Sequence, residues 1–250
     1  MQSEYDSIYL SPHLDDVALS CAGQVFMKSG ADQNVLVVTV MAGDPPGSTS
    51  EFARSLHGRW QLERDVVASR RKEDEEAMRI LGADLMHWPI PDCIYRSEPT
   101  TGAALYNSNE AIFGTVSELE RPLIIQIAER IRQLPPHGRL FTSLGVGNHV
   151  DHQITRLAAE MVSPHVAYYE EYPYVIIPGA LQRVVDAEDS TLVEEKLSLT
   201  DEAVQKRIEA IAAYRSQVSS FFRDRADLEQ AIENYCRETG GERVWHRAKP

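Results

Sequence analysis

Short apolar runs that alternate with segments of helical periodicity constrain the fold of this 250-residue chain more than any other feature. The run Val35–Met41 is continuous and rich in β-branched residues, which is typical of a strand covered on both faces. Apolar residues at helical spacing precede it in Asp16–Lys28 and follow it from about Trp60 to Leu81. Because strands that alternate with helices indicate βαβ units, we predict an α/β fold with a mostly parallel sheet flanked by helices.

The same pattern continues along the rest of the chain. Further strands are predicted at 8–10, 84–88, 139–143 and 165–169, and further helices at 122–134, 151–161, 200–222 and 224–237. The segment 89–120 is rich in Pro, Gly, Ser and Asn, as functional lids or mobile loops often are. No internal repeat or linker composition interrupts the chain. We therefore expect one domain over 1–250, with a core at about 7–175 and a mostly helical C-terminal elaboration at 176–250.

The charge and the cysteines of the chain limit its partners and its compartment. A net charge of -13 opposes nucleic acid or an anionic membrane as the main partner. The N-terminal residues lack a basic region followed by a long apolar one, and no apolar run approaches the roughly 18 residues of a membrane helix. The three cysteines are scattered and form no CxxC motif. We expect a reduced, cytoplasmic protein without a signal peptide.

Two acidic histidine motifs fall where a predicted strand passes into a helix. They are His13–Asp16, with the sequence HLDD, and His149–His152, with the sequence HVDH. The outer residues of each motif are i and i+3, so they share one face of a first helical turn. Ligands bind at the carboxyl ends of parallel strands, which would bring both motifs to one edge of the sheet. Together they supply three imidazoles and three carboxylates.

That set of side chains matches a catalytic metal site better than a structural one. Two or three imidazoles with a carboxylate and an open position are typical of catalytic Zn²⁺. Extra carboxylates can serve as general base or orient an imidazole. Asp15 and Asp16 could instead simply cap the following helix, and for that dipeptide alone capping is the stronger reading. The second motif, at an equivalent strand end, turns the balance toward a metal site.

Three other functions on the same architecture are less consistent with these residues. A dinucleotide-binding protein would carry GxGxxG after the first strand, where this chain has SPHLDD. The same ligands could hold Fe(II) for oxygen chemistry, but an additional base and histidine suit hydrolysis better. A non-catalytic metal- or sugar-binding module would be indicated by loss of Asp15 or His149, and both are present.

The motifs resemble those of the PIG-L/LmbE family of metal-dependent N-acetylglucosaminyl deacetylases. The family pattern Pro-His-x-Asp-Asp is matched by Pro12–Asp16, and His-x-Asp-His by His149–His152. Between them, Arg70–Glu73 and Leu81-Gly82 match a helix with Arg-x-x-Glu that ends in Leu-Gly, and Asp92 matches an aspartate after the next strand. The resemblance extends from residue 7 to about 175 and implies a Rossmann-like sheet.

The resemblance also implies the metal ligands and the base. His13, Asp16 and His152 would bind the metal, and Asp15 would deprotonate the water that attacks the amide. Spacing alone leaves open which of His149 and His152 is the ligand, and only the resemblance selects His152. The metal is expected to be Zn²⁺, with Fe²⁺ or another divalent metal as the alternative.

The remaining roles are implied in the same way. His149 would stabilise the oxyanion or protonate the leaving amine, and Asp151 would hold the ring of His149. Arg70 would contact a polar or anionic part of the substrate and Asp92 a sugar hydroxyl, with Arg71 as the alternative to Arg70 if the helix is rotated.

One position departs from the family pattern. Some members carry a tyrosine two residues before the later motif, where it assists the oxyanion, and this chain has Gly147 there. Tyr95 or Tyr169 would fill that role from elsewhere. The run Tyr168–Tyr174 is otherwise read as aromatic packing at a strand exit, and the remaining histidines as structural or surface residues, with His57 the nearest to the site.

The sequence therefore predicts a zinc-dependent hydrolase that removes an acetyl group from an N-acetylglucosamine-type amino-sugar conjugate. The alternatives are a related amidase for a different N-acyl conjugate, or a non-catalytic metal- or sugar-binding protein. The expected partner is a small N-acetylated sugar conjugate, without nucleic acid or membrane, and a homo-oligomer is compatible with the sequence.

Overall fold

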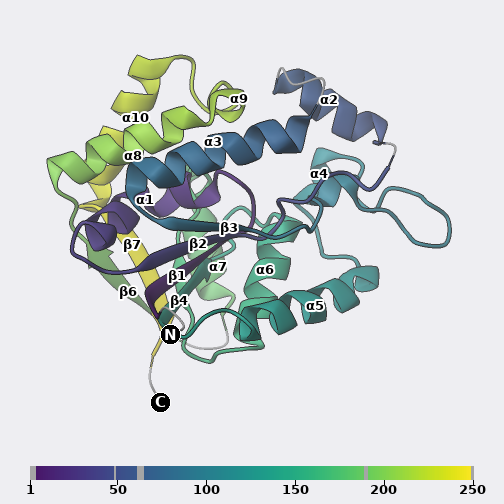
Figure 1. Cartoon of the computed structure of the whole chain (residues 1–250), viewed down its shortest axis with the longest axis horizontal. Coiled ribbons are helices and arrows are strands. Elements are labelled where there is room, and N and C mark those ends of the chain that lie inside the picture. The colour runs from purple at the N-terminus through teal and green to yellow at the C-terminus, as the bar shows by residue number, and fades with distance from the viewer. Residues whose placement is uncertain (1–3, 48, 61–64, 189–190, 249–250) are drawn as a thin grey trace.

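A seven-stranded sheet forms the centre of the protein in the computed structural model, which describes residues 4–47, 49–60, 65–188 and 191–248. The strand order is β3-β2-β1-β4-β5-β7-β6 (Figure 1). The strands are β1 (Tyr5–Ser11), β2 (Val35–Thr39), β3 (Asp84–His87), β4 (His137–Ser143), β5 (Ala167–Tyr169), β6 (Leu192–Leu197) and β7 (Glu242–Arg247).

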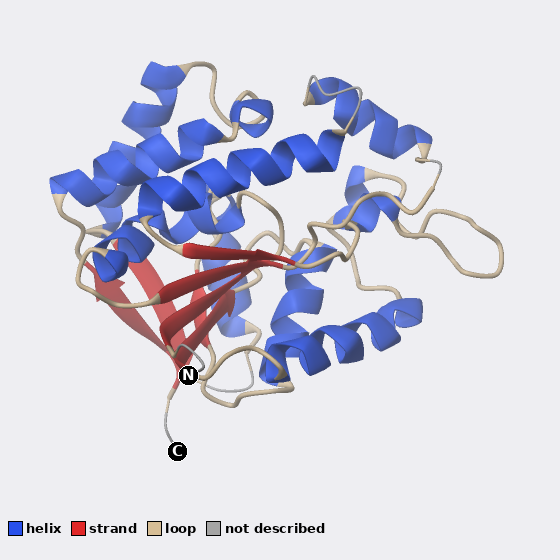
Figure 2. Cartoon of the chain, viewed as in Figure 1, coloured by secondary structure: helices blue, strands red, loops and turns tan. Residues whose placement is uncertain are grey.

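Helices cover both faces of this sheet (Figure 2). One layer contains α1, α3, α8 and α10, and the other contains α5, α6 and α7 (Figure 1). The α-helices are α1 (Asp16–Ser29), α2 (Glu51–Arg59), α3 (Val66–Leu81), α4 (Asn109–Ile112), α5 (Arg121–Arg132), α6 (Val150–Glu160), α7 (Ala180–Asp186), α8 (Asp201–Ala213), α9 (Arg215–Val218) and α10 (Arg225–Thr239). Short 3₁₀ turns are η1 (Cys93–Tyr95), η2 (Glu118–Glu120) and η3 (Tyr174–Ile176).

The first five strands run parallel, as the apolar runs predict. Strand β1 lies between β2 and β4, and Ile8 is in register with Leu36 on one side and Leu140 on the other. All three side chains are buried because helices cover both faces of the sheet. The predicted Rossmann-like α/β class is thereby confirmed.

The C-terminal segment is less helical than predicted. It contains α7 to α10, but β6 and β7 also extend the sheet as antiparallel strands beside β5. Glu242 on β7 is buried, forms an ion pair with Arg207, and accepts hydrogen bonds from the backbone N–H groups of Gly23 and Gln24. These two donors follow a break in α1 at Cys21, so the C-terminal strands complete the packing of the first helix.

Two loop predictions also differ from the structure. The helix expected from about residue 60 begins only at Val66, and residues 61–64 lie outside the described part. Helix α2 precedes them in a stretch for which no helix was predicted. The segment 89–120 contains η1, α4 and η2. A buried ion pair between Arg96 Nε and Glu120 Oε1, 2.5 Å long, ties the two ends of that segment together. Hydrophobic periodicity did not predict these elements, because polar contacts such as this ion pair hold the segment in place.

The order in which strands are added to the sheet reverses between β1 and β4. Strands β2 and β3 lie on one side of β1, whereas β4 and β5 lie on the other. In parallel sheets this switch point is where ligands bind, at the carboxyl ends of the strands. None of the helices in the described part of the chain combines the length and apolar composition needed to cross a membrane.

Candidate active site and metal centre

The two predicted motifs meet at the switch point of the sheet. His13–Asp16 follows β1 directly, and His149–His152 follows β4 by way of the glycine loop 144–148. Because β1 and β4 are hydrogen-bonded neighbours, the helices α1 and α6 begin side by side. The shared sheet edge expected from the sequence is the one observed.

Asp16 lies between two imidazoles. Its Oδ2 atom is 3.3 Å from Nδ1 of His13 and 3.2 Å from Nε2 of His152. The two rings have their centroids 5.3 Å apart. One carboxylate oxygen and two imidazole nitrogens therefore converge on one point, which is the donor set that divalent transition metals prefer. The nitrogens of His13, His149 and His152 form a further group whose ligand atoms all lie within 4.8 Å of one another.

The buried carboxylates around His13 and His152 favour a positive charge at this point. Burial lowers the pKa of His152, but the carboxylates of Asp16 and Glu171 outweigh it and raise the pKa to about 9. Burial likewise lowers the pKa of His13, and the surrounding carboxylates, first Asp92 and then Asp151, raise it well above its usual value. The buried carboxylates thus stabilise positive charge on both rings, and a bound divalent ion would supply that charge in place of protons. The residues present fit a metal.

Glu171 supports this centre, and the sequence analysis did not single it out. Its Oε1 atom is 3.2 Å from Nδ1 of His152, which leaves Nε2 directed at Asp16. Glu171 also accepts hydrogen bonds from the backbone N–H groups of Gly145 and Val146, at 2.7 and 3.1 Å. Such a carboxylate fixes the orientation of a ligand imidazole. The sequence signal was the pair of glutamates inside a buried aromatic stretch, where only partnered charges are tolerated.

Asp15 lies beside Asp16 in the same pocket. It is 7% exposed, and its Oδ1 atom is 3.5 Å from Nη2 of Arg70. Burial raises the pKa of Asp15, and the guanidinium of Arg70 acts in the opposite direction. A carboxylate whose pKa is raised toward neutrality is a better proton acceptor. Capping is not its role, because the Asp15 side chain makes no cap hydrogen bond at the start of α1.

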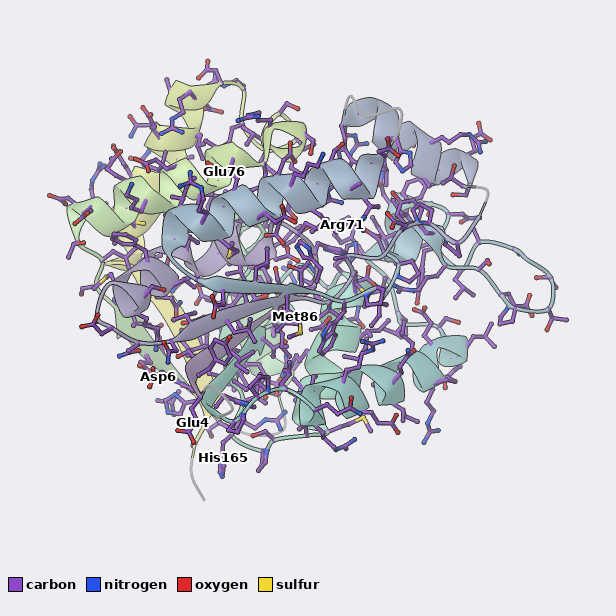
Figure 3. All side chains as sticks on the ribbon, viewed as in Figure 1. Glu4, Asp6, Arg71, Glu76, Met86 and His165 are labelled. Carbon is purple, nitrogen blue, oxygen red and sulfur yellow. The ribbon has the colours of Figure 1, made fainter. Side chains whose placement is uncertain are left out.

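Arg70, rather than Arg71, faces the pocket. Arg70 is buried, and its guanidinium lies 4.8 Å from the centre of the Trp60 ring. Arg71 (labelled in Figure 3) instead donates a hydrogen bond to the carbonyl of Ala42 and pairs with the exposed Asp44. Helix α3 is therefore oriented about its axis so that Arg70, and not Arg71, lines the pocket.

Most of the predicted residues line one cavity of about 270 Å³, which we call the metal pocket. Its walls include His13, Asp15, Asp16, Arg70, Asp92 and His149. Asp92 stands at its rim, where Oδ1 accepts from the N–H of Ile94 and Oδ2 is 3.7 Å from Nε2 of His13. His165, in contrast, precedes β5, and Figure 3 labels it on the same side of the ribbon as Glu4 and Asp6, at the amino ends of the strands.

Comparison with known proteins accounts for this arrangement. A family model described as PIG-L, GlcNAc-PI de-N-acetylase, matches residues 8–163, which is more than half of the chain. The chain belongs to the PIG-L family. The 2'-N-acetylparomamine deacetylase of Niallia circulans is 29% identical over 185 residues, which cover 67% of this chain and 66% of that protein.

Solved structures of deacetylases share the whole fold with this PIG-L protein. The zinc inhibited form of teicoplanin deacetylase Orf2 has a TM-score of 0.86 and 26% identity, and 99% of each chain is covered. A deacetylase–teicoplanin complex has a TM-score of 0.81 at 26% identity, with 99% of each chain covered. The predicted family, the α/β fold and the deacetylase class of amide hydrolase are confirmed by these findings. The cluster of His13, His149 and His152 and the zinc inhibited form of a relative support a divalent metal.

The later motif of this PIG-L chain differs from prediction in the contacts of Asp151. Asp151 was expected to hold the ring of His149 with its carboxylate. Its Oδ2 atom instead bonds Nε2 of His13 at 3.0 Å and the N–H of Cys93 at 2.9 Å, and Oδ1 pairs with Arg96. The expected contact with His149 is made by the backbone, since the N–H of Asp151 donates to Nδ1 of His149. The carboxylate is drawn away because Arg96 and His13 offer it positive charge.

His149 is held at the start of α6 and lines the pocket. Because Nδ1 accepts a hydrogen bond from the backbone, the proton of the neutral ring lies on Nε2. Nε2 is 3.9 Å from the buried sulfur of Cys93. Burial and the neighbouring His13 lower the pKa of His149 well below its usual value. The ring is thus a neutral N–H donor beside the metal centre.

A tyrosine that the sequence analysis did not select fills the space beside Gly147. The hydroxyl of Tyr169 is buried and donates to the carbonyl of Leu10, so it takes no part in the site. The hydroxyl of Tyr95 is 2.7 Å from Nε2 of His57. A Cβ added to Gly147 would lie 2.6 Å from the ring of Tyr174, which lines the metal pocket. The missing side chain at Gly147 therefore makes room for a ring supplied by a different loop.

Proposed function

We propose that this protein is a Zn²⁺-dependent N-deacetylase that removes the acetyl group from an N-acetylglucosamine-type amino-sugar conjugate. The observation that carries the proposal is the convergence of His13 and His152 on Asp16, with Asp15 beside them in one pocket. The relatives support the substrate class, because one is named for 2'-N-acetylparomamine and others for teicoplanin.

His13, Asp16 and His152 would hold the metal. A divalent ion bound there supplies Lewis acidity, which polarises the acetamide carbonyl and lowers the pKa of water. Glu171 and Asp151 keep the two imidazoles oriented, one through Nδ1 of His152 and the other through Nε2 of His13.

Asp15 takes the proton of the attacking water. It is buried and adjacent to Asp16, so its carboxylate stands next to the ligands without being one of the converging atoms. Arg70 opposes the effect of burial, since the guanidinium lowers the pKa that burial raises. This balance suits a base that works near neutral pH.

His149 serves the other half of the reaction. Its Nε2–H can donate to the oxygen that becomes negatively charged. A neutral ring has no proton to spare for the departing amine, so the proton that Asp15 takes from the water is the one passed on. The backbone N–H of Asp151 fixes which nitrogen of His149 carries its proton. Arg70 would contact a polar or anionic group of the substrate, and Asp92, at the rim, a sugar hydroxyl.

The wider assignments follow from the same structure. The chain is proposed to be one domain over 1–250, because β6, β7 and α8 of the C-terminal part pack on β5, α1 and α3. Its three buried, unpaired cysteines suit the cytoplasm. The proposed partner is a small N-acetylated sugar conjugate, without nucleic acid or membrane, and a homo-oligomer is compatible with these assignments.

Acetate release from N-acetylated sugar conjugates tests the proposal. We expect activity in the purified protein with one equivalent of metal. Asp15→Asn should keep the metal and lose about 10²–10⁴-fold in turnover. His152→Ala should lose the metal itself, measured by elemental analysis. Near-normal turnover of Asp15→Asn would contradict the assignment of the base.

The identity of the metal needs its own titration. One relative is described in a zinc inhibited form. Metal-free protein should therefore be titrated with Zn²⁺ from below to above one equivalent, and in parallel with Fe²⁺, Co²⁺ and Mn²⁺. Activity that rises up to one equivalent of Zn²⁺ supports the proposal. Activity with Fe²⁺, Co²⁺ or Mn²⁺ but none with substoichiometric Zn²⁺ would contradict it.

A further inference from the structure

Glu73, the glutamate of the Arg-x-x-Glu pattern, lies outside the metal pocket that Arg70 lines. It bonds instead to the C-terminal part of the chain. Its Oε1 atom accepts from the backbone N–H of Ser216 at 2.9 Å, and Oε2 accepts from the Ser216 hydroxyl at 2.6 Å. Ser216 belongs to the short helix α9 and is 7% exposed. Both oxygens of one carboxylate therefore hold α9 against α3.

Gln217, the next residue along α9, forms part of the wall of the metal pocket. It is 5% exposed and lines the pocket together with Asp15. Its backbone N–H donates to the carbonyl of Tyr214, and its backbone carbonyl accepts from the N–H of Ser220. Its side-chain Nε2 donates to Oγ of Ser216 at 3.0 Å. No residue in the described part of the chain donates a hydrogen bond to its Oε1, so one buried acceptor is left for a ligand.

The hydroxyl of Ser216 determines which end of the Gln217 amide remains available. That hydroxyl has one proton, and it goes to Glu73 because a carboxylate can only accept. Towards Gln217, Oγ of Ser216 can then only accept, so the amide has to present its Nε2 to Ser216. Oε1 is thereby fixed as the free end. Glu73 is a positioning residue, since it acts on Gln217 through Ser216.

We infer that Oε1 of Gln217 accepts a hydrogen bond from a ring hydroxyl of the sugar whose N-acetyl group enters the metal pocket, and that Glu73 and Ser216 set the orientation of this amide. The inference rests on the proposed function, because it names a contact with the same substrate. A buried acceptor selects for a donor, since a ligand without one would leave the oxygen unpaired. The C-terminal part of the chain thereby takes part in the choice of sugar.

Sugars that lack one hydroxyl test this inference directly. Binding of methyl 2-amino-2-deoxyglucoside, a deacetylated product, and of its 3-, 4- and 6-deoxy forms is measured by calorimetry on the metal-loaded protein. Loss of one hydrogen bond between neutral groups corresponds to about 3–10-fold in affinity. Gln217→Met keeps the length of the side chain and removes the acceptor. It should bind the parent compound about 3–10-fold more weakly than the original chain does, and it should bind one of the deoxy forms as the original chain does.

The matching N-acetyl compounds separate binding from turnover. In Gln217→Met, KM should rise and kcat should change little, because the hydroxyl contact is made in the ground state and in the transition state alike. A role in stability alone would lower the free energy of unfolding and would not distinguish one deoxy form from another. The free energy of unfolding is therefore measured with urea for each variant.

Glu73→Gln tests the positioning role without changing any residue of the pocket. A glutamine at this position can donate to Oγ of Ser216, which frees the hydroxyl proton to bond Oε1 of Gln217. The Gln217 amide then turns its Nε2 outward, so Glu73→Gln should weaken binding of the parent compound by the same factor and spare the same deoxy form. The double variant Glu73→Gln/Gln217→Met should lose no more than Gln217→Met alone. Glu75→Gln is the matched control, because Glu75 is exposed on the same helix, and it should bind the series as the original chain does.

The outcomes separate this inference from the proposed function. Unchanged binding by Gln217→Met, or an equal loss for the parent and for every deoxy form, would overturn the hydroxyl contact even if acetate is released. Losses that add up in the double variant would overturn the positioning role of Glu73. Absence of acetate release with a loss that spares one deoxy form would support the contact and contradict the proposed function. If Gln217→Met does not fold, the deoxy series on Glu73→Gln decides in the same way.

Discussion

Replacing Glu171 by Gln should weaken metal binding through a residue that is not expected to touch the metal. Glu171 accepts from Nδ1 of His152 at 3.2 Å and so directs Nε2 of that ring toward Asp16. Loss of such a carboxylate partner costs about 10–100-fold in metal affinity. Glu171→Gln should therefore bind Zn²⁺ about 10–100-fold more weakly than the original chain.

The same substitution also costs stability, which has to be separated from the effect on the metal. Gly145 and Val146 donate to different oxygens of Glu171, and a glutamine offers only one oxygen. One amide nitrogen would then face a backbone N–H, which costs about 1–3 kcal/mol when buried. The free energy of unfolding, measured with urea on metal-free protein, should fall by that amount.

The neighbouring Glu170 provides the control. It is equally buried but pairs with Arg243 and accepts from the indole of Trp245, away from the metal centre. Glu170→Gln should lose a similar free energy of unfolding and keep its affinity for Zn²⁺. The affinities are compared by competition with a chromogenic chelator. Equal Zn²⁺ affinity in the two variants would show that Glu171 only stabilises the fold, and the assigned orienting role would be wrong.

Two further substitutions test the packing and the charge of the structure. Gly147→Ala places a Cβ 2.6 Å from the ring of Tyr174, so we expect its free energy of unfolding to fall by about 1–3 kcal/mol and its KM to rise. Gly58→Ala is the control, because Gly58 lies in α2 with open space around it, and it should show neither change. An unchanged KM in Gly147→Ala would show that Tyr174 does not shape the substrate pocket. A hydrogen bond from Arg139 lowers the pKa of Glu195 in the folded protein. Glu195 therefore stabilises the fold at pH values above its ordinary pKa of 4.5, and this stabilisation is lost as the pH falls through the lower pKa of the folded state. Because Glu195 is 41% exposed, Glu195→Gln should cost no more than about 1 kcal/mol at pH 7, and the difference in melting temperature should vanish in strong acid; a difference that persists there would refute the ion-pair explanation.

Local sequence was sufficient to predict the alternating parallel strands and helices of the sheet. The run Val35–Met41 is apolar on both faces, so a central strand is its only stable environment, and β2 begins at its first residue. The strands β6 and β7 escaped prediction because charged residues are interspersed along both, Glu194, Glu195 and Lys196 in β6 and Glu242, Arg243 and Arg247 in β7. Glu194 and Trp245 are paired across these strands, and nothing in either segment alone indicates the other.

The sequence by itself determined which histidines and carboxylates gather at the ends of β1 and β4. Spacing within HLDD and HVDH is local, so the chemistry of the donors could be read before the fold was known. Only the tertiary structure decided the contacts between segments far apart in the chain: Glu171 on His152, Asp151 on His13, and the ring of Tyr174 beside Gly147. The physical reason is that a buried charge or ring takes whichever partner the packing brings within reach, and that partner has no fixed distance along the sequence.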